Sequence, residues 1–124
     1  MARDVLIQID DVSLEGALND TKTARAVWDA LPFEAQANMW GEEIYFAIPV
    51  KLELENGQEV VQVGDLGYWP PGNAFCIFFG PTPVSRGKEI RPASAVTVLG
   101  KVTGRLSDLR SVRTGTRVEV SRRA

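Results

Sequence analysis

Residues 64–83 read GDLGYWPPGNAFCIFFGPTP, and this stretch carries the strongest indication of the fold. Its first nine residues include five glycines and prolines, an unbroken apolar run follows, and the rigid sequence Gly-Pro-Thr-Pro ends it. Proline cannot donate a hydrogen bond to a neighbouring strand, and glycine allows the chain to bend sharply. Strands interrupted in this way are typical of a closed, tightly turned β architecture.

The rest of the sequence predicts further strands and one helix. Alternating or β-branched-rich segments indicate strands outside the quoted stretch. They are residues 5–9, 12–18, 33–37, 43–48, 52–54, 59–63, 95–99 and 117–120. Asn56-Gly57 suits a tight hairpin turn, because both residues tolerate positive φ. Residues 21–30 have apolar side chains at helical spacing, and Asn19 or Asp20 is the expected N-cap.

These patterns predict a mainly β fold, a closed barrel of about eight strands with one short helix. Closure is favoured because it removes the exposed edges that a sheet of short strands would otherwise have. The length of 124 residues is usual for one domain, so we expect a single domain over residues 1–124.

The composition argues against several classes of function. Residues 1–100 carry seven basic and fourteen acidic groups, whereas residues 101–124 carry seven basic and two acidic groups. No aromatic platform accompanies the basic segment, so we do not expect nucleic-acid binding. No apolar run reaches the roughly 18 residues that span a membrane, and we see no secretory signal. A single cysteine fits a reducing compartment, and we expect a cytoplasmic protein.

Four blocks of sequence carry a resemblance to a known family. They are Leu18-Asn19-Asp20-Thr21 with Ala24, Trp40-Gly41-Glu42-Glu43-Ile44-Tyr45-Phe46, residues 64–83, and Ala93-Ser94 leading to Val98-Leu99-Gly100. Through these blocks the sequence resembles the cyclophilin-like domain family of small bacterial and archaeal proteins over nearly its whole length. The resemblance implies a compact barrel of about eight strands, similar to that of cyclophilins, with fewer and shorter helices and loops.

The resemblance does not by itself imply an activity. Cyclophilins are peptidyl-prolyl isomerases, in which an arginine stabilises the twisted prolyl amide beside a pocket of aromatic side chains and a histidine. This sequence has no histidine, and it lacks the Phe-His-Arg and Gly-Ser-Gln-Phe-Phe segments of true cyclophilins. Because one barrel can host many functions, isomerase activity does not follow from the fold.

Without histidine, a serine or cysteine nucleophile activated by histidine is excluded. Cys76 lies inside the apolar run, and we expect it in the core rather than in a reactive setting. The glycines match neither the dinucleotide-binding nor the P-loop spacing, and one cysteine without histidine is a poor set of zinc ligands. We therefore predict no metal and no cofactor. Asp65 is expected to hydrogen bond to the local backbone.

Aromatic residues near turns suggest a binding cleft. They are Trp40, Tyr45, Tyr68, Trp69 and Phe79. Flat rings offer a large apolar surface, and tyrosine or tryptophan adds one polar group. The alternative is that these rings pack the barrel.

Three residues are the predicted polar contacts of this cleft: Glu42, Thr82 and Arg91. Neighbouring residues of a strand face opposite sides, so Glu42 lies with Ile44 while Glu43 lies with Tyr45. Either acid would have a raised pKa in an aromatic cleft. Thr82 is held between two prolines, and a rigid strand end is the alternative explanation. An arginine of the following loop could bind a carboxylate or be simply solvated.

The sequence leaves three functions open. The preferred one is a barrel that binds a small molecule or an extended peptide in the aromatic cleft. The first alternative is a divergent peptidyl-prolyl isomerase, whose reaction needs no general base. The second is a subunit or regulatory domain of a larger enzyme assembly, with a partner subunit or a second copy of the chain as its partner.

Overall fold

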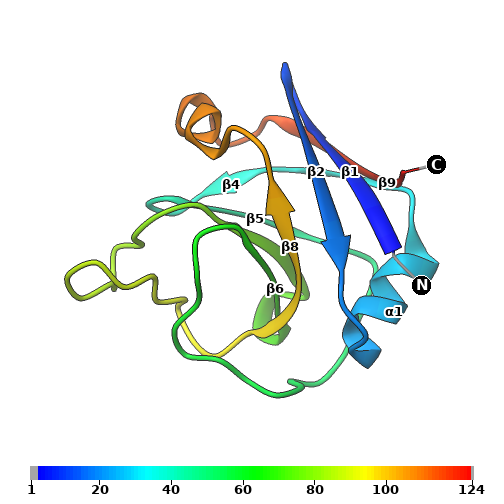
Figure 1. Ribbon diagram of the computed structural model, residues 1–124, viewed down its shortest axis with the longest axis horizontal. Coiled ribbons are helices and arrows are strands. Elements are labelled where there is room, and N and C mark those ends of the chain that lie inside the picture. Colours follow the sequence, from blue (N-terminus) through cyan, green and yellow to red (C-terminus); the bar gives the residue numbers. More distant parts are fainter. Residues whose placement is uncertain (1–2, 124) are drawn as a thin grey trace.

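The computed structural model describes residues 3–123, which form nine strands, one α-helix and two short 3₁₀ helices (Figure 1). The strands are β1 (Arg3–Ile9), β2 (Val12–Leu18), β3 (Phe33–Gln36), β4 (Asn38–Met39), β5 (Glu43–Ala47), β6 (Asp65–Trp69), β7 (Ala74–Phe78), β8 (Thr97–Thr103) and β9 (Arg117–Arg122). The helical elements are α1 (Lys22–Ala30), η1 (Pro70–Gly72) and η2 (Leu106–Ser111).

All nine strands belong to one antiparallel sheet with the order β3-β9-β1-β2-β8-β6-β7-β5-β4. The two edge strands, β3 and β4, follow one another in the chain and are separated only by Ala37. Ala37 donates its N–H to the Thr116 carbonyl at 2.7 Å and accepts from the Gly115 N–H at 2.8 Å. The sheet therefore curls into a nearly closed barrel, and the predicted fold class is confirmed, with nine strands in place of about eight.

The main core fills the barrel, and α1 lies at one of its ends (Figure 1). Ala24 and Val27 of α1 are fully buried in that core. Thr21 is the N-cap, and its hydroxyl accepts a hydrogen bond from the Ala24 N–H at 3.0 Å. The predicted cap was wrong by one or two residues, because Asn19 instead accepts the N–H of Thr21 at 3.1 Å. No helix within residues 3–123 is long and apolar enough to cross a membrane.

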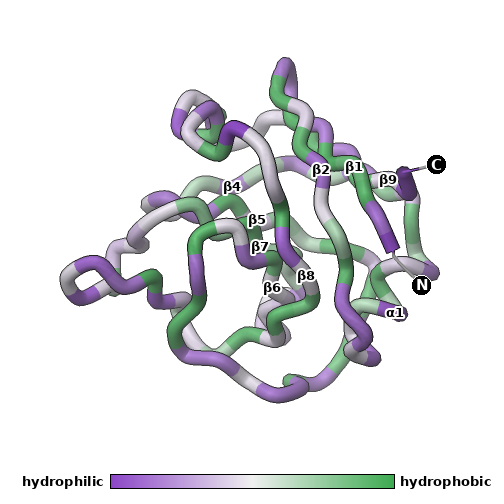
Figure 2. Tube along the Cα trace, viewed as in Figure 1, coloured by the Kyte–Doolittle hydropathy of each residue, from purple (hydrophilic) through white to green (hydrophobic). Residues whose placement is uncertain are grey.

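Strand β7 is buried on both faces, which explains its unbroken apolar sequence. Phe75 and Ile77 point into the main core. The other three residues of β7 belong to a second cluster. Residues from segments before and after the strand complete this cluster. That cluster consists of Val61, Ala74, Cys76, Phe78, Ile90 and Val96. Figure 2 shows hydrophobic residues gathered toward the middle of the barrel and hydrophilic ones on the loop that protrudes from it.

Two details of the predicted strand pattern were wrong. Residues 50–64 form isolated bridges instead of the predicted hairpin: Gln58 pairs with Val96 and Val61 pairs with Ile90. The segment after the Asn56-Gly57 turn therefore pairs with a distant loop rather than with the segment before the turn. Strand β8 also continues through Gly100 to Thr103, where the sequence predicted an end.

Candidate functional site

The turn between β4 and β5 places an indole ring and a carboxylate opposite one another. Trp40 and Glu43 bond across it, with N···O distances of 2.9 Å and 3.2 Å. Gly41 sits in the turn at φ +61°, a conformation that side chains other than glycine rarely adopt. A Cβ at this position would also lie 2.8 Å from Pro83 Cδ. Glycine here therefore lets the turn pack closely against the segment after β7.

Large and small side chains alternate across the outer face of β5, β7 and β6. Tyr45 of β5 is paired with Cys76 of β7, and Trp69 of β6 is paired with Ala74 of β7. The small residues on the middle strand leave a hollow between the two rings. The Trp69 Nε1–H donates to Ser94 Oγ at 2.7 Å, which ties the ring to the loop before β8.

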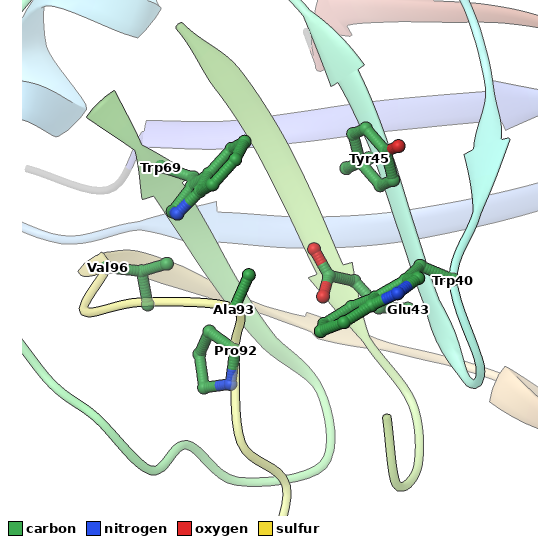
Figure 3. Close-up of a pocket in the computed structure, with 7 residues that line it drawn as sticks. All are labelled: Trp40, Glu43, Tyr45, Trp69, Pro92, Ala93 and Val96. Carbon is green, nitrogen blue, oxygen red and sulfur yellow. The ribbon is translucent and has the colours of Figure 1, made fainter. Parts of the chain in front are cut away.

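The hollow is a pocket of about 250 Å³ on the outer side of the barrel wall (Figure 3). It is lined by Trp40, Glu43, Tyr45, Trp69, Pro92, Ala93 and Val96. Figure 3 shows the three aromatic rings around the space and the Glu43 carboxylate pointing into it from the side of Trp40. Pro92, Ala93 and Val96 close the remaining side.

Glu43 is the polar centre of this pocket. The residue is only 6% exposed, and its Oε1 atom has no hydrogen-bond partner within residues 3–123. Burial raises the pKa of Glu43 from 4.5 to about 7, and the Cys76 thiol offsets a smaller part of that rise. Burial also raises the pKa of Cys76 well above its usual value, so the thiol stays neutral. The carboxyl group can therefore exist in either protonation state near neutral pH.

The structure brings three of the predicted ligand-binding residues together in the pocket: Trp40, Tyr45 and Trp69. Tyr68, by contrast, is fully buried in the main core. Its hydroxyl donates to the Val50 carbonyl at 2.7 Å and accepts from the Leu52 N–H at 3.1 Å. Tyr68 thus faces the barrel interior, because neighbouring residues of β6 point to opposite sides.

Two further predicted residues, Phe79 and Glu42, also lie outside the pocket lining. Phe79 packs in the main core. Glu42 accepts a hydrogen bond from Arg110 Nε at 2.8 Å and packs over Gly80. A Cβ at Gly80 would lie 2.5 Å from the Glu42 carboxyl carbon, so this glycine makes room for the acid.

Thr82 and Arg91 hold the loop after β7 in shape. The Thr82 hydroxyl donates to the Arg91 carbonyl, and Ser85 Oγ accepts the Thr82 N–H at 2.9 Å. The Arg91 guanidinium donates to Glu89 at 2.7 Å, which lowers the pKa of that carboxyl. Arg91 lines a separate shallow groove that shares Pro92 and Ala93 with the pocket.

Sequence reasoning did not select four pocket residues: Glu43, Pro92, Ala93 and Val96. Strand alternation held the signal for Glu43, since a residue two positions from Tyr45 faces the same side. The other three come from a loop and from the residue before β8. No local sequence pattern indicates which strands of the barrel the loop before β8 covers.

Two other residues considered in the sequence, Cys76 and Asp65, have structural roles. Cys76 is buried, as predicted. Asp65 Oδ2 accepts the Gln62 N–H at 2.8 Å, which confirms the predicted local backbone contact. Among residues 3–123, no group of three or more His, Cys, Asp or Glu side chains is placed to hold a metal ion.

Comparisons with known proteins agree with the architecture. The family model described as Cyclophilin-like matches residues 3–121. The chain is similar to the hypothetical protein AF2241 from Archaeoglobus fulgidus, known from a solution structure, with 42% sequence identity and a TM-score of 0.83. That match covers 98% of this chain and 95% of the archaeal chain. Among curated proteins, none matches the sequence significantly.

Proposed function

We propose that this chain, which belongs to the cyclophilin-like family, binds a small organic molecule in the pocket between Trp40, Tyr45 and Trp69. The observation that carries the proposal is the arrangement of three half-buried aromatic side chains around one hollow. Binding sites are typically concave, mostly apolar and equipped with a few polar groups. This pocket has that character.

The volume of about 250 Å³ favours a compact ligand. Pockets that enclose drug-sized molecules usually measure about 300–1,000 Å³, so a nucleotide or another large cofactor would extend well beyond this one. A planar or globular apolar group could stack on the indole rings of Trp40 and Trp69, since such rings give a large contact area at little entropic cost.

The lining favours binding over prolyl isomerisation. An isomerase of the cyclophilin type needs an arginine directed at the prolyl amide, and none of the seven lining residues is an arginine. Arg91, the predicted candidate for a positive contact, is paired with Glu89 in the neighbouring groove. Among the seven described residues that line the pocket, the one charged side chain is that of Glu43, an acid.

A panel of small fragments, followed by amide and indole NMR spectra of the labelled protein, tests this function. We expect binding fragments to shift the indole N–H signals of Trp40 and Trp69 and to leave that of Trp28 unchanged. Trp28 lies in α1 beneath the Arg122 guanidinium and outside the pocket lining. It therefore serves as an internal reference.

Two variants and one assay sharpen the result. Trp40→Ala should weaken fragment binding about tenfold through lost ring contact. Trp28→Ala, the matched control, should leave it unchanged. If no fragment shifts the two pocket indoles, the binding function is rejected. If the protein instead accelerates cis/trans exchange of an Xaa-Pro peptide and Trp40→Ala abolishes that activity, the isomerase alternative replaces it.

A further inference from the structure

The Oε1 atom of Glu43 lacks the hydrogen-bond partner that a buried carboxyl oxygen ordinarily has, and the neighbouring Cys76 thiol offsets only a smaller part of the effect of burial. Buried polar atoms are nearly always hydrogen bonded, and a buried carboxylate is normally paired with a cation or bound to a metal. Glu43 Oε1 has neither within residues 3–123, although the residue is more than nine-tenths buried. The carboxylate points into the pocket rather than into the core (Figure 3). A partner for it would therefore come from whatever occupies the pocket.

The aromatic rings around the carboxylate select the same kind of partner. The face of an aromatic ring carries partial negative charge and attracts cations, most strongly when the ring belongs to tryptophan. Two tryptophans and one tyrosine border the space that the Glu43 carboxylate enters (Figure 3). The aromatic rings and the Glu43 carboxylate would thus both attract a positively charged ligand.

The lining also disfavours anionic ligands. None of the seven lining residues is lysine or arginine, so a carboxylate or phosphate in the pocket would face Glu43 without a counter-charge. A neutral apolar ligand would fill the hollow but leave the acid without a partner. With either an anionic or a neutral apolar ligand, the buried carboxyl oxygen would stay without a favourable partner, whereas a cation would pair with it.

We propose that the pocket takes a cationic ligand, a protonated or alkylated amine on a compact apolar body, with Glu43 as its counter-charge and the three rings as its walls. This inference rests on the proposed function, because it specifies the chemical class that the same pocket binds. It adds the charge of the ligand and the residue that recognises it.

Binding of a permanent cation should depend on pH through Glu43. The Cys76 thiol of β7 acts on this carboxyl, and Tyr45 of β5 lines the same pocket, whereas β6 and the loop before β8 contribute Trp69 and apolar residues. With a pKa of about 7, Glu43 is protonated in acid and must lose that proton to pair with a cation. The affinity should thus fall as the pH drops through the pKa, down to the affinity that the rings alone provide, and level off above it.

Choline and its neutral isostere, the alcohol in which a tert-butyl group replaces the trimethylammonium group, test the charge separately from the shape. Both are titrated into the labelled protein at about pH 8 and about pH 5, and the Trp40 and Trp69 indole signals are followed. We expect choline to bind at least about tenfold more tightly than the alcohol at the higher pH. That preference should shrink at the lower pH.

The variant Glu43→Gln keeps the shape of the side chain and removes its charge. We expect it to reduce the preference for choline to the part that the aromatic rings alone provide and to abolish the pH dependence, while Glu42→Gln, the matched control outside the pocket, retains both. The pH series on the unaltered protein tests the same point without any substitution.

Each outcome separates this inference from the function on which it rests. If the alcohol binds as tightly as choline at both pH values, the cation proposal is overturned and the pocket remains a binding site. If affinity rises in acid instead, Glu43 acts as a hydrogen-bond donor to a neutral ligand, and the cation proposal is again overturned. If neither compound shifts the two indoles, the cation proposal is rejected, and the fragment panel alone decides whether the pocket binds anything.

Discussion

At the scale of single residues, Glu43 shows how a barrel wall can hold an acid in an unfavourable state. Strand alternation forces its side chain outward, and the loop before β8 then covers it. Little of the side chain remains in contact with water, and no cation within the described residues replaces that solvation. The pKa of about 7 is the direct consequence. Groups with such perturbed pKa values concentrate at functional sites, because a ligand can supply the counter-charge or hydrogen bond that the protein does not provide.

This raised pKa makes stability depend on pH. The folded protein holds the Glu43 proton up to about pH 7, whereas the unfolded chain releases it near 4.5. The folded state therefore binds more protons in that window, and the free energy of unfolding should fall as the pH rises through it. A shift of this size corresponds to a loss of up to about 3 kcal/mol.

Glu43→Gln should remove that loss, because glutamine does not titrate. Urea denaturation at intervals across the window measures the effect, and the difference between the variant and the unaltered protein should grow in favour of the variant as the pH rises. Glu42→Gln, whose parent carboxylate pairs with Arg110 outside the pocket, should keep the original profile. Parallel profiles for Glu43→Gln and the unaltered protein would contradict the assignment.

At the scale of elements, β8 links the two halves of the sheet by pairing with both β2 and β6. Its glycine, Gly100, makes the pairing with β2 possible. A Cβ there would lie 2.3 Å from the Ala17 carbonyl oxygen and 3.0 Å from Leu18 Cα. These are backbone atoms, which cannot rotate out of the way. A glycine that signals a strand end in sequence is here the residue that allows the strand to continue.

Gly100→Ala should therefore separate β8 from β2 and destabilise the fold by about 2–3 kcal/mol or more. Chemical denaturation measures the loss, and hydrogen exchange should show weakened protection in both strands. Lys101→Ala is the control in the same strand, since this side chain is exposed and its contact with Asp65, at 3.9 Å, is a weak surface pair. Equal stability of the two variants would show that β2 tolerates the added methyl group.

At the scale of the whole molecule, one extended segment closes the barrel. Residues 33–39 pair with β9 through β3 and with β5 through β4, so a single stretch of chain joins the two edges of the sheet. Ala37 lies at the joint, fully buried, with both backbone groups bonded to residues 115 and 116. Closure here depends on chain continuity as much as on strand pairing.

Ala37→Pro should open the barrel at this joint. Proline removes the N–H that bonds to Thr116 and adds a ring where no space is left, which should cost at least about 2 kcal/mol. Hydrogen exchange should show β9 and β5 losing protection together, although they are far apart in the sheet order. Glu34→Ala, an exposed change in β3, should have little effect on either strand. Loss of protection in one strand alone would mean that the two edges are held independently.

The class of the fold and most of its strands could be predicted from the amino-acid sequence. Gly/Pro punctuation, alternation and the cyclophilin-like blocks are local signals, so they predicted the barrel, the helix at residues 21–30 and the buried place of Cys76. They also identified Trp40, Tyr45 and Trp69 as aromatic residues near turns. Strand alternation also indicated that Glu43 shares a face with Tyr45, although Glu42 was the acid predicted to contact the ligand.

Which of these residues lie together depends on long-range contacts that the sequence pattern does not reveal. The pocket is formed by a hairpin turn, two non-adjacent strands and a loop before β8, and the loop is placed by long-range contacts such as Trp69 with Ser94. Separate bridges pair Gln58 with Val96 and Val61 with Ile90, in place of the hairpin that Asn56-Gly57 predicts locally. Local patterns specify whether a segment is a strand, a helix or a turn. Which distant segments pack on the outer face of β7 depends instead on the burial of its apolar side chains. The site exists because that second covering layer leaves one hollow beside a buried carboxyl group, whose Oε1 atom has no hydrogen-bond partner within residues 3–123.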